Sequence, residues 1–278
     1  MYRPARVATC AIAALLLAAT VRAPSASASQ AAKAVPVVFV HGFFADKCPD
    51  GLDVSSAMSG PTGELTDRGW TGRLDVVSFY ACDHGGSRIG KDTTDTSIRR
   101  IGSQLAHYIY RTYTENGQSV DIVGHSIGGL AARVAIKFAR AHLLGFPPSL
   151  LVNRVVTFST PYKGVTRSAI REVPGFPGTR QARQVRVGSS FLTYLATHGD
   201  VAGTKWLVIG SSGGCDIVRG ASAVGVPHAL RLRYTGCWSH NQYLYDATPT
   251  RSYPAYRNGV LTMAYGPLRQ MSMFLAKS

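Results

Sequence analysis

The sequence predicts an α/β fold with a mostly parallel sheet that is covered by helices on both faces. Strand patterns and helix patterns alternate through much of the chain, and this alternation is typical of parallel sheets. The strand patterns are short β-branched and apolar runs that end at turn residues, as expected of buried strands. About 250 residues follow a predicted leader, and chains of that length often form one domain of this kind.

Six segments carry the strand pattern, and we expect the last of them to be the final strand of the sheet. They are residues 35–40, 74–80, 120–123, 152–158, 206–209 and 230–234. Helical spacing of apolar residues predicts helices within residues 95–113, 130–144, 188–195 and 261–276. The stretch 43–72 is rich in Gly, Pro, Ser and Asp, so we expect a loop there with one short helix.

Residues 1–28 have the three-part layout of a secretory signal peptide. A basic start is followed by an apolar run from Val7 to Val21, and small residues then lead to Ala28. This run is shorter than the roughly 20 apolar residues that a helix needs to span a bilayer. We therefore expect an exported, soluble protein in which residues 29–278 form a single domain. A retained N-terminal anchor is the alternative.

Residues 162–187 differ from the rest of the chain, because they combine several Gly and Pro residues with many cations. The basic residues are Lys163, Arg167, Arg171, Arg180, Arg183 and Arg186. The whole chain has a formal net charge of +15. Such a charge favours approach to anionic surfaces such as lipid head groups or wall polymers, but it does not identify a substrate. Nucleic acid is not an expected partner, because the sequence has no recognisable binding motif for it and no compact basic run.

The strongest chemical signal is the segment Gly124-His125-Ser126-Ile127-Gly128, which follows a predicted strand and precedes an Ala-rich predicted helix. A G-x-S-x-G pattern alone occurs often by chance, but a strand-to-helix turn is the setting in which it carries a nucleophilic serine. Its two outer glycines keep side-chain bulk away from the bend, so the Ser126 hydroxyl can project above the sheet. The positive N-terminal end of the following helix points toward the reacting centre. We therefore predict that Ser126 is the nucleophile of an acyl-transfer reaction, with an ordinary glycine-rich turn as the alternative.

Acyl transfer also requires hydrogen-bond donors for the negative oxygen of the tetrahedral intermediate. We predict that the backbone N–H of Ile127, directly after the nucleophile, is one donor. The second donor should come from the loop after an earlier strand, where we assign the backbone N–H of Phe43 in His41-Gly42-Phe43. His41 precedes the nucleophile in the sequence, so we interpret it as a residue that shapes the turn and not as the base. This chemistry requires no cofactor and no metal.

A serine nucleophile needs a base, and the base needs an acid that orients it. In folds of this type the order along the chain is Ser, then Asp or Glu, then His. Asp216 follows a predicted strand through a glycine-rich loop and is our candidate acid, whereas Asp200 precedes that strand and Asp246 follows the expected histidine. His240 follows the predicted final strand and is our candidate base, whereas His228 precedes that strand.

Four cysteines follow the leader: Cys48, Cys82, Cys215 and Cys237. An even count in an exported protein predicts two disulfides, for which three pairings are possible. We favour Cys48–Cys82 and Cys215–Cys237, because each pair joins loops that lie near one another in the predicted topology. The second bridge would connect the loop of the candidate acid to the loop of the candidate base. Free buried thiols are the alternative, and a zinc site is disfavoured because no C-x-x-C pair is present.

Several motifs occur in a characteristic order along the chain. They are Val38-Phe39-Val40-His41-Gly42, then Gly124-His125-Ser126-Ile127-Gly128-Gly129, then Ser159-Thr160-Pro161, followed by the segments that hold the candidate acid and base. In this combination the chain resembles secreted bacterial lipases and esterases of the α/β-hydrolase family. The resemblance implies hydrolysis of carboxylic esters, often acylglycerols, through an acyl-serine intermediate. It also implies a mobile lid in the region that matches residues 162–187.

We therefore expect a secreted, monomeric serine ester hydrolase whose partners are ester or lipid substrates. The same residues could instead serve a thioesterase, an acyltransferase or a polyester depolymerase. A non-catalytic, cationic surface-binding protein is the alternative from a different class. A binding role of that kind would not need a complete set of Ser126, Asp216 and His240.

Overall fold

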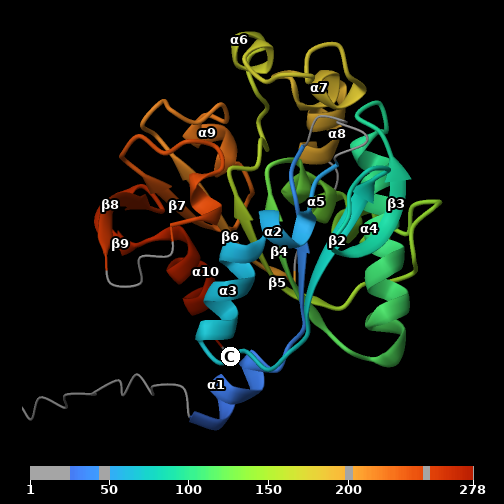
Figure 1. Ribbon diagram of the computed structural model, residues 1–278, viewed down its shortest axis with the longest axis vertical. Helices are drawn as coiled ribbons and strands as arrows, with labels where there is room; N and C mark the ends of the chain where they lie inside the picture. The colour runs from blue at the N-terminus through green and yellow to red at the C-terminus, as the bar shows by residue number, and fades with distance from the viewer. Residues whose placement is uncertain (1–25, 44–50, 198–202, 247–250, 278) are drawn as a thin grey trace, which may run out of the picture.

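The computed structural model describes residues 26–43, 51–197, 203–246 and 251–277, and these residues are arranged around one mixed sheet (Figure 1). Within these ranges the sheet has nine strands in the order β3-β2-β1-β4-β5-β6-β7-β8-β9. The strands are β1 (Val37–Val40), β2 (Leu74–Tyr80), β3 (Ser87–Asp92), β4 (Val120–His125), β5 (Val152–Phe158), β6 (Lys205–Ser211), β7 (Leu230–Tyr234), β8 (Ser252–Arg257) and β9 (Val260–Tyr265). The pairs from β3 through β7 are parallel, and the two pairs beyond β7 are antiparallel.

Ten α-helices and two 3₁₀ helices lie within the described ranges. The α-helices are α1 (Ala26–Lys33), α2 (Val54–Ala57), α3 (Ser59–Asp67), α4 (Ile98–Thr112), α5 (Ile127–Arg140), α6 (Arg167–Arg171), α7 (Arg180–Val185), α8 (Ser190–Thr197), α9 (Gly220–Ala223) and α10 (Pro267–Leu275). The 3₁₀ helices are η1 (Thr114–Asn116) and η2 (Gln242–Leu244). In this part of the chain, no helix has both the length and the apolar character needed to cross a bilayer.

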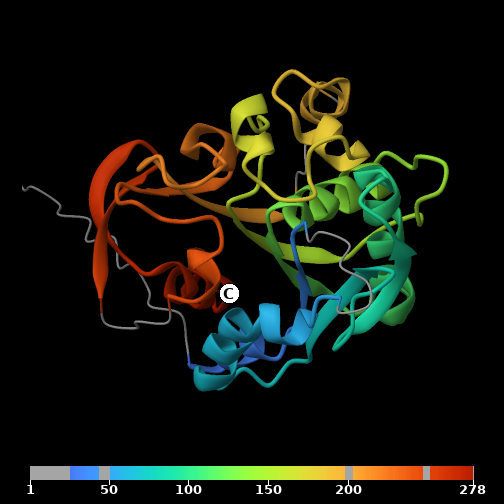
Figure 2. The same ribbon diagram turned by 45° about the horizontal axis from the view of Figure 1, so that its top comes forward.

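Helices cover both faces of the sheet, as β1 illustrates. Successive side chains of a strand point to opposite faces. Val38 and Val40 belong to a core shared with α4 and α5, whereas Val37 and Phe39 belong to a core shared with α3 and α10. Figure 2 shows these two helix layers on either side of the strands. The predicted α/β-hydrolase architecture, a mostly parallel sheet with helices on both faces, is therefore confirmed.

The C-terminal part of the sheet differs from the prediction. We expected β7 to be the final strand and residues 261–276 to be one helix, but β8 and β9 follow β7, and α10 begins only at Pro267. The cause is a two-residue hairpin turn between β8 and β9, in which Asn258 and Gly259 both have positive φ, at 50° and 92°. Asn-Gly is the sequence that best suits such a turn, so the signal was present in the sequence.

The prediction was incomplete in two further places, and the leader stays a prediction. In its described residues, the stretch 43–72 contains two short helices, α2 and α3, where we expected a loop with one. The edge strand β3 was not predicted, because its sequence, SRIGKD, is mostly polar and half-exposed. The predicted leader lies largely outside the described residues, and its expected end at Ala28 falls within α1. The cationic segment 162–187 contains α6 and α7, which project beyond the sheet at the end where the parallel strands finish (Figure 1).

Candidate active site

Ser126 occupies a sharp turn between β4, which ends at His125, and α5, which begins at Ile127. Its backbone has φ 53° and ψ −126°, which is a strained conformation for a residue other than glycine. The backbone N–H of Ser126 donates to the carbonyl oxygen of Phe158 on β5, at 2.9 Å. This bond fixes the turn against the neighbouring strand and leaves the serine hydroxyl free to project from it.

The turn requires glycine on both sides of Ser126. A Cβ on Gly124 would lie 2.8 Å from the Gly129 backbone, and a Cβ on Gly128 would lie 2.3 Å from the carbonyl oxygen of Val40. Both distances are shorter than real Cβ contacts, and the atoms in the way belong to the backbone. The G-x-S-x-G spacing is therefore explained by the close approach of α5 to β4 and β1.

The structure brings Ser126, His240 and Asp216 together in a hydrogen-bonded chain. His240 Nε2 lies 2.9 Å from Ser126 Oγ, and His240 Nδ1 lies 2.9 Å from Asp216 Oδ1. The Asp216 side chain is 2% exposed and the His240 side chain 19% exposed, so the carboxylate is sealed from water while the imidazole reaches the pocket. Asp216 follows β6 and His240 follows β7. Parallel strands end at the same edge of a sheet, and this common edge places both residues beside the β4–α5 turn.

Three further donors hold the carboxylate of Asp216. Ser159 Oγ donates to its Oδ2 at 2.5 Å, Tyr243 Oη donates to the same oxygen at 3.0 Å, and the Val218 N–H donates to Oδ1 at 2.9 Å. Burial raises the pKa of this carboxyl group, but the hydrogen bond and charge of His240, together with Ser159 and Val218, hold the pKa below its ordinary value. Asp216 is therefore ionised beside the imidazole.

His125 lies next to His240 and remains neutral. Its Nε2 is 3.0 Å from the His240 carbonyl oxygen, and because a carbonyl can only accept, Nε2 carries the proton. Burial, reinforced by the neighbouring His240, lowers the pKa of His125 to about 3. The two rings lie 4.8 Å apart. His125 thus supports the His240 backbone without adding positive charge to the site.

His41 lies at the end of β1, immediately before the loop that contains Phe43. Its Nδ1 donates to the Gly42 carbonyl oxygen at 2.8 Å, and its Nε2 lies 3.0 Å from Asp83 Oδ2. The same carboxylate oxygen accepts the backbone N–H groups of Phe79 and Tyr80, at 3.2 and 2.8 Å. His41 and Asp83 are each 2% exposed, so this buried pair anchors the start of the loop to the end of β2.

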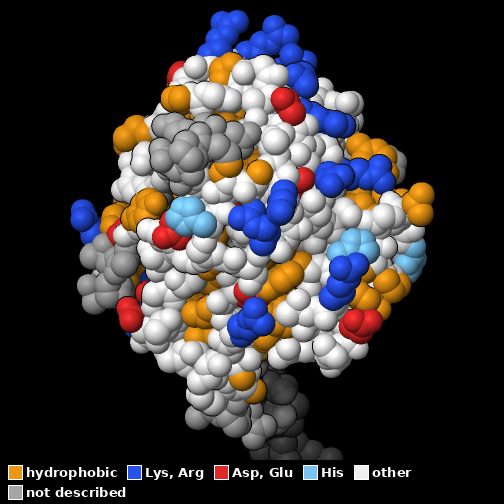
Figure 3. All heavy atoms as spheres, turned by 45° about the vertical axis from the view of Figure 1, so that its right-hand side comes forward, with side chains coloured by type: hydrophobic (Ala, Val, Ile, Leu, Met, Phe, Trp, Pro, Cys, Tyr) orange, Lys and Arg blue, Asp and Glu red, His pale blue; other side chains and the backbone are white. Residues whose placement is uncertain are grey.

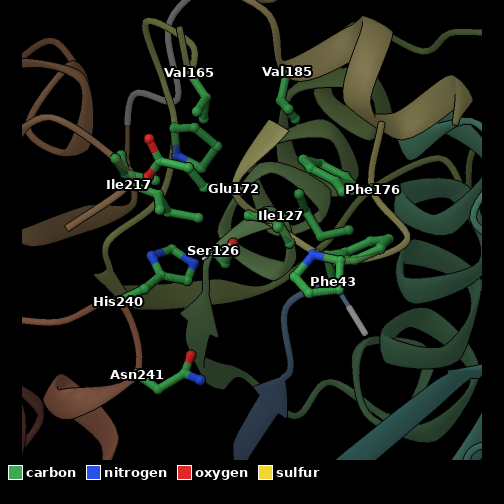
Figure 4. Close-up of a pocket in the computed structure, with 14 residues that line it drawn as sticks. Phe43, Ser126, Ile127, Val165, Glu172, Phe176, Val185, Ile217, His240 and Asn241 are labelled. Carbon is green, nitrogen blue, oxygen red and sulfur yellow. Dashed lines mark hydrogen bonds between the residues drawn. The ribbon is translucent and has the colours of Figure 1, made fainter. Parts of the chain in front are cut away.

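A cavity of about 260 Å³ opens beside Ser126 and His240 (Figure 4). Its lining is mainly apolar: Phe43, Ile127, Pro161, Val165, Val173, Pro174, Phe176, Val185, Ile217 and Val218. Ser126, Glu172, His240 and Asn241 are the polar lining residues. In this view Ile127 and Phe43 lie on the side of Ser126 away from His240. An ester carbonyl at Ser126 would therefore have the imidazole on one side and these two residues on the other.

A disulfide joins Cys215 to Cys237 and connects the loop of Asp216 to the loop of His240. Cys82 is also disulfide-bonded. Cys48, which we predicted as its partner, lies outside the described residues. Among the residues that the structure describes, no group of three or more His, Cys, Asp or Glu side chains is arranged to hold a metal ion.

The hydrogen-bonded chain that reaches Ser126 consists of His240 and Asp216, the candidate base and acid. Asp200, a rival candidate for the acid, lies outside the described residues. Sequence reasoning missed Ser159, Tyr243 and Asp83 as partners of the site, and it gave His125 no role of its own. Ser159 could have been suspected, because it directly follows a predicted strand.

A serine on a strand-to-helix turn, bonded to a histidine that a buried aspartate orients, defines a serine hydrolase of the α/β-hydrolase fold. Residues 32–174, about half of the chain, match the model of a protein family described as "Putative serine esterase (DUF676)". The chain belongs to this family, and it is a serine ester hydrolase.

Solved structures support the same fold. The mature form of Bacillus licheniformis lipase BlEst2 is 20% identical with a TM-score of 0.50, and the match covers 76% of this chain and 87% of that one. Aspergillus fumigatus lipase B is 15% identical with a TM-score of 0.52, and the match covers 81% of this chain but only 52% of that one. At this level of identity the similarity shows the fold alone. A search of curated proteins found no match.

Proposed function

We propose that the protein is a secreted hydrolase of carboxylic esters with apolar acyl groups, such as acylglycerols and other fatty-acyl esters. The main support is the apolar cavity of about 260 Å³ that opens beside the Ser126 hydroxyl. Each methylene group buried in such a cavity is worth about 0.8 kcal/mol. The cavity is therefore suited to the acyl chain, and residues 162–187, which supply several of its walls, would be its lid.

In the acylation half of the proposed reaction, Ser126 attacks the ester carbonyl carbon while His240 Nε2 accepts the hydroxyl proton. Asp216 holds the proton of His240 at Nδ1 and stabilises the imidazolium that forms. The backbone N–H groups of Phe43 and Ile127 donate to the negative carbonyl oxygen. His240 then gives the proton to the leaving alcohol, and the acyl group remains on Ser126.

In the deacylation half, His240 removes a proton from water, which attacks the acyl-serine carbonyl carbon. The same two N–H groups stabilise the second tetrahedral intermediate. Collapse of this intermediate releases the carboxylic acid, and the proton on His240 returns to Ser126. The Cys215–Cys237 disulfide supports the proposal of secretion, because such bonds persist in oxidising compartments.

The test is hydrolysis of p-nitrophenyl esters by Ser126→Ala, with Ser190→Ala on an exposed part of α8 as the matched control. We expect Ser126→Ala to keep its thermal unfolding temperature and to lose at least about 10⁴-fold in kcat, while the control keeps its activity. Undiminished turnover by Ser126→Ala would refute the assignment of the nucleophile. A panel of oxyesters and thioesters of equal acyl length, with and without an acceptor alcohol, would distinguish hydrolysis of esters from thioesterase or acyltransferase activity.

A further inference from the structure

Basic side chains gather on the surface at the end of the molecule where α6 and α7 lie (Figure 3). We call this set the cationic collar. Its members are Lys163, Arg167, Arg171, Arg180, Arg183 and Arg186, and all six are exposed. The same segment of chain contains a single acidic residue, Glu172.

The collar borders the apolar cavity of the candidate active site. The segment that carries these cations also supplies Val165, Val173, Pro174, Phe176 and Val185 to the cavity lining. Basic and lining residues are therefore neighbours along the chain, and one segment supplies both positive charge and cavity wall. Among the described residues that line the cavity, Glu172 is the only one with a carboxylate.

In the part of the chain that the structure describes, no carboxylate pairs with the collar cations. Among the described residues, none of the six forms an ion pair, whereas basic residues elsewhere pair with Glu64, Asp75 and Asp92. Asp95, at the start of α7, accepts the backbone N–H of Arg180 and no collar guanidinium. Like charges held together without counter-charges repel one another, so a surface of this kind is suited to an anionic partner.

Apolar side chains lie between the cations. Val187 is 55% exposed next to Arg186, and Pro174 and Pro177 are exposed between α6 and α7. A soluble polyanion would satisfy the cations but would offer nothing to these residues. A lipid bilayer offers anionic head groups to the cations and an apolar interior to the apolar side chains.

We propose that the cationic collar binds the surface of an anionic phospholipid bilayer and sets the mouth of the cavity against it. Fatty-acyl esters held in the membrane can then enter the cavity directly from it. The partner is a bilayer rich in anionic head groups, such as phosphatidylglycerol. This inference rests on the proposed function for the substrate that enters the cavity, but the binding itself does not require catalysis.

The test measures binding of Ser126→Ala protein to vesicles of phosphatidylcholine alone and of phosphatidylcholine mixed equally with phosphatidylglycerol. The collar variant carries Arg167→Gln, Arg171→Gln, Arg180→Gln and Arg183→Gln. The matched control carries Arg111→Gln, Lys205→Gln, Arg231→Gln and Lys277→Gln, all exposed. Lys205 and Arg231 lie at the amino ends of β6 and β7, away from the site. Both variants have the same net charge.

We expect the parent to bind the mixed vesicles and to release them as salt is raised, because exposed charges are screened. Each collar cation removed should lower the partition coefficient about fivefold, and the control should lose much less. Equal losses in the two variants would overturn the proposal, since net charge alone would then explain binding. Tight binding to heparin without binding to vesicles would also overturn it, in favour of a soluble polyanion.

Thermal unfolding of both variants shows whether they fold. Hydrolysis of a soluble p-nitrophenyl ester by protein with Ser126 intact tests the proposed function separately. Vesicle binding without ester hydrolysis would support the collar and refute the proposed function. Hydrolysis without vesicle binding would support the proposed function and refute the collar.

Discussion

The disulfide between Cys215 and Cys237 joins two loops that would otherwise be free to separate. One loop carries Asp216 and the other carries His240. The double variant Cys215→Ser, Cys237→Ser removes this bridge. Both cysteines are exposed, so the substitutions change little buried surface. The sequence separation is 22 residues, for which the chain-entropy model gives a stabilisation of about 3 kcal/mol. For a domain of this size, that loss lowers Tm by roughly 6–12 °C.

Circular dichroism during heating, and urea denaturation at 25 °C, would measure this loss. Ser239→Ala, an exposed substitution in the same loop as Cys237, is the matched control and should leave Tm unchanged. We also expect the double variant to lose esterase activity at temperatures below its own Tm, because the loops of Asp216 and His240 can then move apart. If the free energy of unfolding decreased by less than about 1 kcal/mol, the reasoning that the bridge restricts the unfolded chain would be refuted.

Two further predictions concern buried carboxylates. Ser159→Ala removes the hydroxyl that donates to Asp216 at 2.5 Å. Hydrogen bonds to charged groups are worth roughly 1.5–3 kcal/mol, so kcat/KM should fall about 10- to 100-fold. A change below twofold in steady-state kinetics would contradict this prediction. Burial raises the pKa of Asp121 from 3.8 to about 7, with Arg154 opposing the shift. The unfolded chain loses this proton at lower pH than the folded chain does. The free energy of unfolding should therefore fall as pH rises from about 4 to about 7, by at most about 1.4 kcal/mol per pH unit. Above about pH 7, Asp121 should cause no further change. Asp121→Asn should flatten this slope in urea denaturation at a series of pH values, and an unchanged slope would contradict the assignment.

The sequence could predict the central part of the fold because local signals and tertiary placement agree there. The strand patterns at 74–80, 152–158 and 230–234 coincide with β2, β5 and β7. These strands have β-branched and apolar runs that are closed by turn residues. The hairpin at Asn258-Gly259 was not predicted, because the apolar residues after it also fit a helical spacing.

The same contrast applies to the site. Ser126, Asp216 and His240 could be proposed from sequence because each follows a strand, and strands of a parallel sheet end at one edge. Tyr243 could not, because its hydroxyl reaches Asp216 only through the way η2 folds back after His240. Asp83 could not either, since it meets His41 through the bend after β2 and not through any sequence motif.

Three histidines lie close to Ser126, and their partners explain why we propose only His240 as the base. His41 has Nδ1 on the Gly42 carbonyl oxygen and Nε2 facing Asp83, so both of its nitrogens are directed at protein groups. His125 donates from Nε2 to the His240 backbone and is kept neutral by burial. His240 alone combines a carboxylate on Nδ1 with the serine hydroxyl on Nε2. We therefore propose that the proton moves between Ser126 and this ring, while the other two rings keep the surrounding loops in place.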